Sequence, residues 1–151
     1  MHNFLNKALQ LLRKHDFLTS LEQRHCAMIV RGGAIISTGY NSHDTNSFVQ
    51  HYTRMVGQHK CNTTHAEMDA IKQVRSKTDL RGCKIFVARI CLGSKKPGLA
   101  RPCNICERVL YEYGITRAIY TISEEEYGVM KILAPKNTID RTVMVENAVA
   151  V

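Results

Sequence analysis

The chain has 151 residues, a formal net charge of +8 and a pI near 9.3, with 44% hydrophobic and 23% charged residues. This length and composition predict one globular domain with its own core. No stretch approaches the roughly 18 uninterrupted apolar residues of a membrane-spanning helix, and the first residues lack the pattern of a secretory signal. The basic balance favours a phosphorylated or nucleic-acid partner.

The chain begins with a predicted helix and then a predicted hairpin. Apolar residues recur at helical spacing along residues 3–19, so this helix is expected to cover a sheet. Residues 26–30 and 34–38 are expected strands. Gly32 and Gly33 are the expected hairpin turn between them, because glycine tolerates a positive φ.

A long polar connection, residues 42–63, follows the hairpin. Connections of this size tend to be functional or mobile. We expect residues 48–56 to form a short helix that walls a substrate pocket. His43, His51 and His59 are not spaced convincingly for a second metal site, which favours a solvated loop.

The middle of the chain predicts a helix and then a buried strand. The helix covers residues 65–75, and its first three positions are His65, Ala66 and Glu67. The strand covers residues 84–89, since a continuous apolar run is typical of a strand buried on both faces.

A basic loop, residues 92–100, precedes a second predicted helix. Lys95 and Lys96 of this loop are candidates to reach a phosphate, and a solvated turn is an equal alternative. The helix covers residues 102–113 and is expected to stop at Gly114.

The last third predicts a strand over residues 117–122 and then an ambiguous stretch. Residues 123–126 match a capping box, which favours a helix. The glycine early in residues 127–132 favours a hairpin strand instead, and we prefer the hairpin. The tail, residues 134–151, is a candidate for a short edge strand.

Two short motifs carry the chemistry. One supplies the imidazole of His65 and the carboxylate of Glu67, and the other supplies the thiolates of Cys103 and Cys106. Three nitrogen or sulfur ligands plus water are typical of a catalytic zinc site. If a helix opens at Pro102, both thiolates lie on one face of its first turn, where the helix N-terminus favours their negative charge.

These motifs match the H-x-E…P-C-x-x-C signature of zinc-dependent base deaminases. From about residue 26 to about residue 122 the chain resembles the cytidine deaminase superfamily. The resemblance implies an α/β fold, a three-layer α/β/α sandwich with a central mixed sheet of about five strands. It implies one zinc-dependent deaminase domain over residues 1–151, with zinc held between two helix N-termini. A homo-oligomer is also expected.

The resemblance also implies roles for individual residues. His65, Cys103 and Cys106 would hold Zn²⁺, and Glu67 would be the catalytic proton shuttle. The list of expected substrate contacts is Asn41 on the sugar, Ala66, and the backbone carbonyl of Arg101 on the leaving amine. The alternative for Asn41 is an ordinary turn residue.

The run His-Ala-Glu-Met-Asp-Ala-Ile is closest to the deoxycytidylate (dCMP) deaminases, which usually carry Asn where Asp69 stands. We therefore predict a hydrolase of a cytosine mononucleotide, converting dCMP to dUMP. The alternatives are a deaminase of cytosine or adenine in RNA or DNA and a non-catalytic zinc-stabilised binding subunit. The presence of Glu67 argues against the last.

Six cysteines are present, and four of them lie outside the C-x-x-C motif. Three of these four, in or beside apolar runs, are interpreted as reduced core residues. Thiol ligands for a metal, without a secretory signal, favour a reducing compartment and a cytoplasmic protein without membrane contact.

Overall fold

The computed structural model describes residues 1–17, 21–44, 47–56, 63–74, 76 and 80–134. Their helices and strands follow one another as α1 (Asn3–Lys14), β1 (Gln23–Arg31), β2 (Ala34–Tyr40), α2 (Ser47–Val56), α3 (Ala66–Lys72), β3 (Lys84–Cys91), β4 (Pro97–Gly98), α4 (Asn104–Glu112), β5 (Arg117–Thr121) and β6 (Tyr127–Lys131). The strands form one mixed sheet in the order β2-β1-β3-β5-β6. The pair β3 and β5 is parallel, and the other neighbours are antiparallel.

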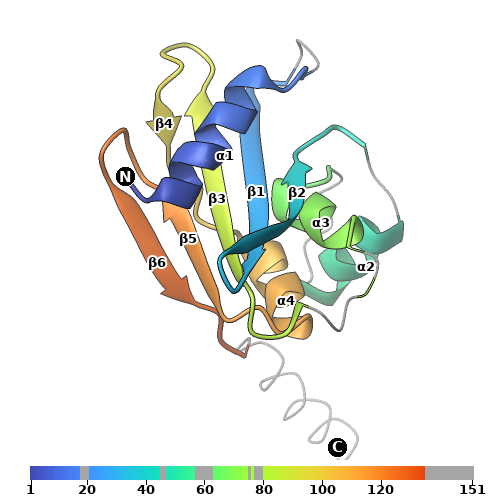
Figure 1. Cartoon of the computed structure of the whole chain (residues 1–151). Coiled ribbons are helices and arrows are strands. Elements are labelled where there is room, and N and C mark those ends of the chain that lie inside the picture. The colour runs from blue at the N-terminus through green and yellow to red at the C-terminus, as the bar shows by residue number, and fades with distance from the viewer. Residues whose placement is uncertain (18–20, 45–46, 57–62, 75, 77–79, 135–151) are drawn as a thin grey trace, which may run out of the picture.

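Helices cover both faces of this sheet, so the fold has three layers. Figure 1 shows α1 across one face and α2, α3 and α4 gathered on the other. The sequence explains this arrangement, because successive side chains of a strand point to opposite faces. Along β1, Met28 packs with the buried stripe of α1, whereas Ala27 and Ile29 join the core under α3 and α4. The predicted three-layer α/β/α architecture is confirmed.

The first helix is shorter than predicted. It ends at Lys14, since His15 already has extended backbone angles, whereas the periodic pattern predicted a helix to residue 19. Phe17, beyond the end of the helix, is buried in the same cluster as Leu21 and the apolar residues of α1. Residues 18–20 lie outside the described part of the chain.

The predicted N-terminal hairpin is confirmed, with longer strands. Gly32 and Gly33 have φ of 55° and 82°, as the tight turn requires. The second strand continues to Tyr40, whereas a strand over residues 34–38 was predicted. Gly39 lies within β2 and packs directly against the backbone of α3, where a larger side chain would not fit.

The ambiguous C-terminal stretch is a hairpin, as preferred from the sequence. β6 runs antiparallel to β5, with Thr121 opposite Tyr127. The capping-box residues form the turn instead of a helix, and the Ser123 hydroxyl accepts from the Glu126 N–H at 3.3 Å. The predicted edge strand of the tail falls on residues 135–151, outside the described residues, apart from Ala134, which belongs to no element.

The basic loop before α4 is more ordered than predicted. Its β4 residues pair with Arg89 and Ile90 of β3. β5 pairs with β3 only as far as Val87, so β4 continues the sheet where β5 has ended. Within the described part of the chain, no helix is long and apolar enough to cross a membrane.

Candidate metal centre and active site

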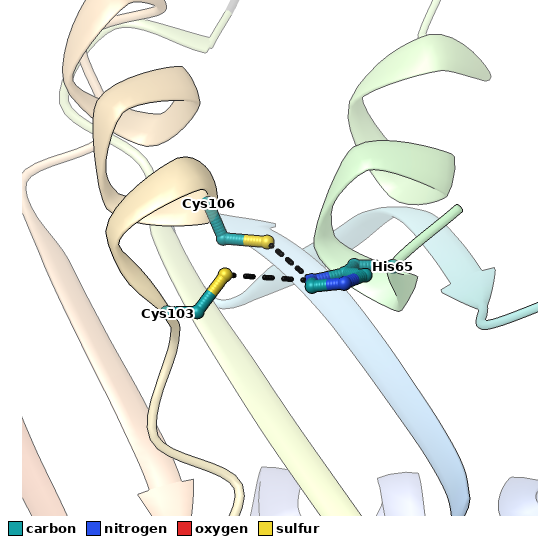
Figure 2. A group of neighbouring side chains, drawn as sticks. All are labelled: His65, Cys103 and Cys106. Atoms are coloured by element: carbon teal, nitrogen blue, oxygen red, sulfur yellow. Dashed lines mark hydrogen bonds between the residues drawn. The ribbon is translucent and has the colours of Figure 1, made fainter. Parts of the chain in front are cut away.

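The N-termini of two helices meet on the same face of the sheet, and a candidate metal ligand occupies the N-cap position of each. His65 is the N-cap of α3 and Cys103 is the N-cap of α4, both with extended backbone angles. The α4 helix therefore starts at Asn104, later than the predicted Pro102. Neither side chain caps its own helix, and Figure 2 shows both pointing into the space between the helices.

Hydrogen bonds at the two ends of the long connection fix the position of the first residue of α3. Ser42 and Thr64 form an isolated bridge, with the Ser42 N–H donating to the Thr64 carbonyl at 3.0 Å. The Thr64 hydroxyl donates to the Asp44 carbonyl at 2.6 Å. The two ends of the connection are thus tied together immediately before His65.

The three predicted metal ligands lie together, and their spacing fits zinc. Nδ1 of His65 lies 3.2 Å from Sγ of Cys106 and 3.5 Å from Sγ of Cys103 (Figure 2). Tetrahedral zinc, with bonds of about 2.0–2.1 Å to nitrogen and 2.3 Å to sulfur, would separate a nitrogen ligand from a sulfur ligand by about 3.5 Å. Small shifts of these side chains would therefore complete a tetrahedral set with one open position.

The two thiols differ in acidity. A hydrogen bond from Cys106 lowers the pKa of Cys103 to about 4, despite its partial burial. The same hydrogen bond, with complete burial, raises the pKa of Cys106 well above its usual value. Thiolates are the form that binds metal, so Cys103 is already in that form at neutral pH.

Glu67 lies beside this cluster but is not a member of it. It follows the N-cap by two residues, on the first turn of α3, and only 5% of its surface is exposed. Burial raises the pKa of its carboxyl. A buried carboxyl next to a metal centre is suited to carry a proton, because it is not held as a permanent ion pair.

A cavity of about 290 Å³ opens beside the cluster. This is close to the lower end of the range for small-molecule sites, about 300–1,000 Å³. It is lined by Gln23, His25, Asn41, Thr63, Thr64, His65, Ala66, Glu67, Arg89, Leu99, Ala100, Arg101 and Cys103. Six of the seven predicted site residues are in this set, and the seventh, Cys106, is buried behind Cys103 in the cluster.

Asn41 lines the cavity, and its amide is also used by the sheet. Its Oδ1 accepts from the His25 N–H at 2.7 Å, and its Nδ2 donates to the Gln23 carbonyl at 2.6 Å. These bonds extend the pairing of β1 and β2 beyond the last residue of β2. They hold the side chain in one orientation, and its contact with a sugar stays a prediction.

The expectation that a short helix walls the cavity is wrong, and of the two alternatives for Lys95 and Lys96 the solvated turn is the one observed. The predicted short helix exists as α2, but none of its residues lines the cavity; Phe48 packs instead against Tyr113 after α4. Lys95 and Lys96 are also absent from the lining, and exposed Lys96 lies 3.8 Å from the Glu124 carboxylate. The pairing of β4 with β3 holds Lys95 and Lys96 outside the cavity, whereas Leu99 and Ala100, later in the same loop, line it.

Asp69, the departure from the motif of the dCMP deaminases, is not in the cavity lining. Its carboxylate accepts from the Tyr40 N–H at 2.9 Å and from the Gln73 amide at 3.1 Å. It therefore ties α3 to the end of β2, a task for which an asparagine oxygen would also serve.

Sequence reasoning missed His25 and Arg89, two polar residues of the cavity floor. They lie opposite each other in the pairing of β1 with β3. Burial, with Arg89 nearby, lowers the pKa of His25 to about 4, so the imidazole is neutral at pH 7. The available signal was Arg89, which has apolar residues on both sides in β3, whereas His25 follows two polar residues at the start of β1 and gave none.

The comparisons agree with this site. The chain matches the family described as the cytidine and deoxycytidylate deaminase zinc-binding region over residues 1–122. It is similar in structure to cytidine deaminase from Burkholderia pseudomallei (TM-score 0.56, 18% identity, covering 87% of this chain and 93% of that chain). It is also similar to cytidine deaminase from Mycobacterium leprae (TM-score 0.51, 18% identity, covering 85% and 94%).

The dCMP deaminase of cyanophage S-TIM5 aligns with a TM-score of 0.49 at 19% identity, covering 78% of this chain and 76% of that chain. No curated protein sequence matches. The two cytidine deaminase structures confirm the predicted α/β, cytidine deaminase-like fold. Because the family match spans most of the chain and includes a zinc-compatible His65–Cys103–Cys106 cluster, this protein belongs to the cytidine and deoxycytidylate deaminases and is a zinc-dependent deaminase.

Proposed function

We propose that the protein deaminates a cytosine mononucleotide hydrolytically, converting dCMP to dUMP. The observation that carries the choice of substrate is the charge of the cavity. Among its lining residues, Glu67 is the one carboxylate, whereas Arg89 and Arg101 supply two permanent cations. A cavity with this balance favours an anionic substrate over a neutral nucleoside.

The reaction exchanges a C–N bond for a C–O bond, consuming water and releasing ammonia. Zinc, when bound by His65, Cys103 and Cys106, lowers the pKa of the attacking water toward neutrality. Glu67 takes the proton from that water and delivers it to the ring nitrogen of cytosine. It then takes the remaining proton from the newly added hydroxyl and passes it to the amino group, which leaves as ammonia as the C–N bond breaks.

Further residues would orient the base and sugar. The Arg101 backbone carbonyl accepts a hydrogen bond from the leaving amine, and Ala66 contacts the base beside it. Asn41 contacts the sugar. All three residues line the cavity that holds Glu67, which supports these assignments.

The test compares dCMP, deoxycytidine and a cytosine-containing oligonucleotide at two salt concentrations, with ammonia release as the readout. We expect robust activity on dCMP with a shallow salt dependence, because one phosphate is bound. A polynucleotide substrate would engage many phosphates, so its binding would weaken steeply with salt. Activity confined to the oligonucleotide would replace this proposal with nucleic-acid deamination. Absence of activity on all three substrates would contradict the proposal that the protein acts on cytosine nucleotides.

A further inference from the structure

Arg89 is placed in the cavity by the pairing of three strands. It lies near the end of β3, opposite His25 of β1 and Gly98 of β4. A Cβ at Gly98 would lie 3.7 Å from Cδ and 3.8 Å from Nε of Arg89, so β4 passes directly over the arginine stem. This cover keeps Nε from solvent while the side chain still lines the cavity.

The guanidinium of Arg89 is not satisfied by the protein. Its Nε is buried and has no hydrogen-bond partner. Its Nη1 donates to the Leu99 carbonyl at 3.4 Å, a long bond. No carboxylate within the described ranges pairs with it. The arginine as a whole is half-buried, and an N–H left unpaired at its buried Nε is costly, so the side chain calls for an explanation beyond the fold.

The second arginine of the cavity differs in this respect. Arg101 donates from Nη1 to the Tyr120 hydroxyl at 3.3 Å, and its guanidinium carbon lies 5.9 Å from the centre of the Tyr120 ring. Both a hydrogen bond and a cation–π contact therefore hold it within the protein. His25 lies opposite Arg89 in the pairing of β1 with β3.

We infer that Arg89 binds the 5′-phosphate of the nucleotide and so sets the preference for a nucleotide over a nucleoside. This inference rests on the proposed function, and it assigns to one residue of the cavity floor the phosphate contact that the sequence suggested for Lys95 and Lys96. A guanidinium presents a planar fork of N–H donors, which matches two oxygens of a phosphate. The terminal N–H groups of Arg89, beyond the stem that β4 covers, are the donors that would meet the phosphate in the cavity.

The test uses Arg89→Gln, which removes the charge, and Arg89→Lys, which keeps the charge and loses the fork. Lys96→Gln is the matched control, because it removes a cation from the loop outside the cavity. For each variant, kcat/KM is measured on dCMP and on deoxycytidine. Binding of dUMP and of deoxyuridine is measured by calorimetry, since it requires no turnover.

For Arg89→Gln, we expect kcat/KM on dCMP to fall about tenfold to a hundredfold, as for a lost charge-assisted hydrogen bond. Activity on deoxycytidine should change little, so the preference for the nucleotide disappears. dUMP should bind about tenfold to a hundredfold more weakly, with deoxyuridine unaffected. Arg89→Lys should keep an intermediate preference, and Lys96→Gln should behave as wild type.

Several outcomes overturn the inference. One is an equal loss on dCMP and deoxycytidine, which marks Arg89 as structural, and another is a full dCMP preference in Arg89→Gln. A third is unchanged binding of dUMP by Arg89→Gln, which places the phosphate on another residue. If wild type fails to deaminate dCMP but binds dUMP through Arg89, the proposed function fails and the phosphate site stands.

Discussion

Nδ1 of His65 lies 3.5 Å from Sγ of Cys103, and each residue is the N-cap of its own helix. The N-cap is the position from which a side chain leaves the helix at its positive end. Two such positions facing each other hold one nitrogen and one sulfur ligand on rigid elements. Cys106, three residues into the α4 segment from its cap, adds the second sulfur.

The first prediction concerns the metal. Purified protein should carry about one zinc per chain, and Cys103→Ala should lose it, because two of the three protein ligands cannot hold a catalytic zinc tightly. Elemental analysis of protein never exposed to chelator measures this. Cys91→Ala is the matched control, since Cys91 is outside the cluster and should keep zinc. Full zinc content in Cys103→Ala would show that this sulfur is not a ligand.

The second prediction concerns the proton shuttle. Glu67→Gln should keep zinc and the thermal stability of the fold while lowering turnover by at least about a hundredfold, the lower range for a lost general acid–base. Steady-state ammonia release and elemental analysis of the same preparation measure both. Glu125→Gln removes an exposed carboxylate outside the cavity and should leave turnover unchanged. Near-normal turnover in Glu67→Gln would mean that another group moves the proton.

The ligand set could be predicted because its signal is local. Pro102 and the spacing of Cys103 and Cys106 predict the start of one helix. The change from a polar connection to a helical apolar pattern predicts the start of another at His65. The structure moves the second helix start by two residues to Asn104 but keeps both sulfurs on the first turn. Short-range rules were sufficient here because a helix N-terminus orders its own residues.

The cavity walls could not be predicted in the same way, because they depend on which strands are neighbours. Arg89 and His25 are 64 residues apart in number and become opposite only through the pairing of β1 with β3. Residues 48–56 gave the correct helix but the wrong neighbour, since the pattern specifies an apolar face and not its partner. Lys95 and Lys96 were near the motif in sequence, and pairing of β4 with β3 directs them away from the cavity.

The third prediction concerns Asp69, which differs from the usual residue of the dCMP deaminases. Asp69→Asn should keep the preference for dCMP over deoxycytidine, because the side chain bonds to Tyr40 and Gln73 outside the cavity. Asp69→Ala should lower the free energy of unfolding by about 1–3 kcal/mol, as it leaves the Tyr40 N–H without its acceptor. Urea unfolding measures the second effect. A changed substrate preference in Asp69→Asn would instead place Asp69 in recognition.

The last prediction concerns Gly39, where β2 runs against α3. A Cβ at this position would lie 2.5 Å from the Ala66 carbonyl oxygen and 2.8 Å from the Ala70 Cα, and both neighbours are backbone of the helix that follows His65. Backbone cannot turn aside as a flexible side chain can, so Gly39→Ala must push α3 away from the sheet. Overpacking of this kind costs about 1–3 kcal/mol, which for a chain of this size lowers the Tm by several degrees.

The displaced helix also carries Glu67, so the same variant should bind zinc more weakly and lose turnover, although Gly39 touches neither metal nor substrate. Gly93→Ala is the matched control, because a Cβ there would meet nothing within 4 Å. Its free energy of unfolding should stay within about 1 kcal/mol of wild type, as expected for glycine to alanine at an open position. Thermal unfolding and zinc content, measured on both variants, test whether the contact of β2 with α3 positions the metal centre. If Gly39→Ala and Gly93→Ala have the same Tm and the same zinc content, this contact does not position the metal centre.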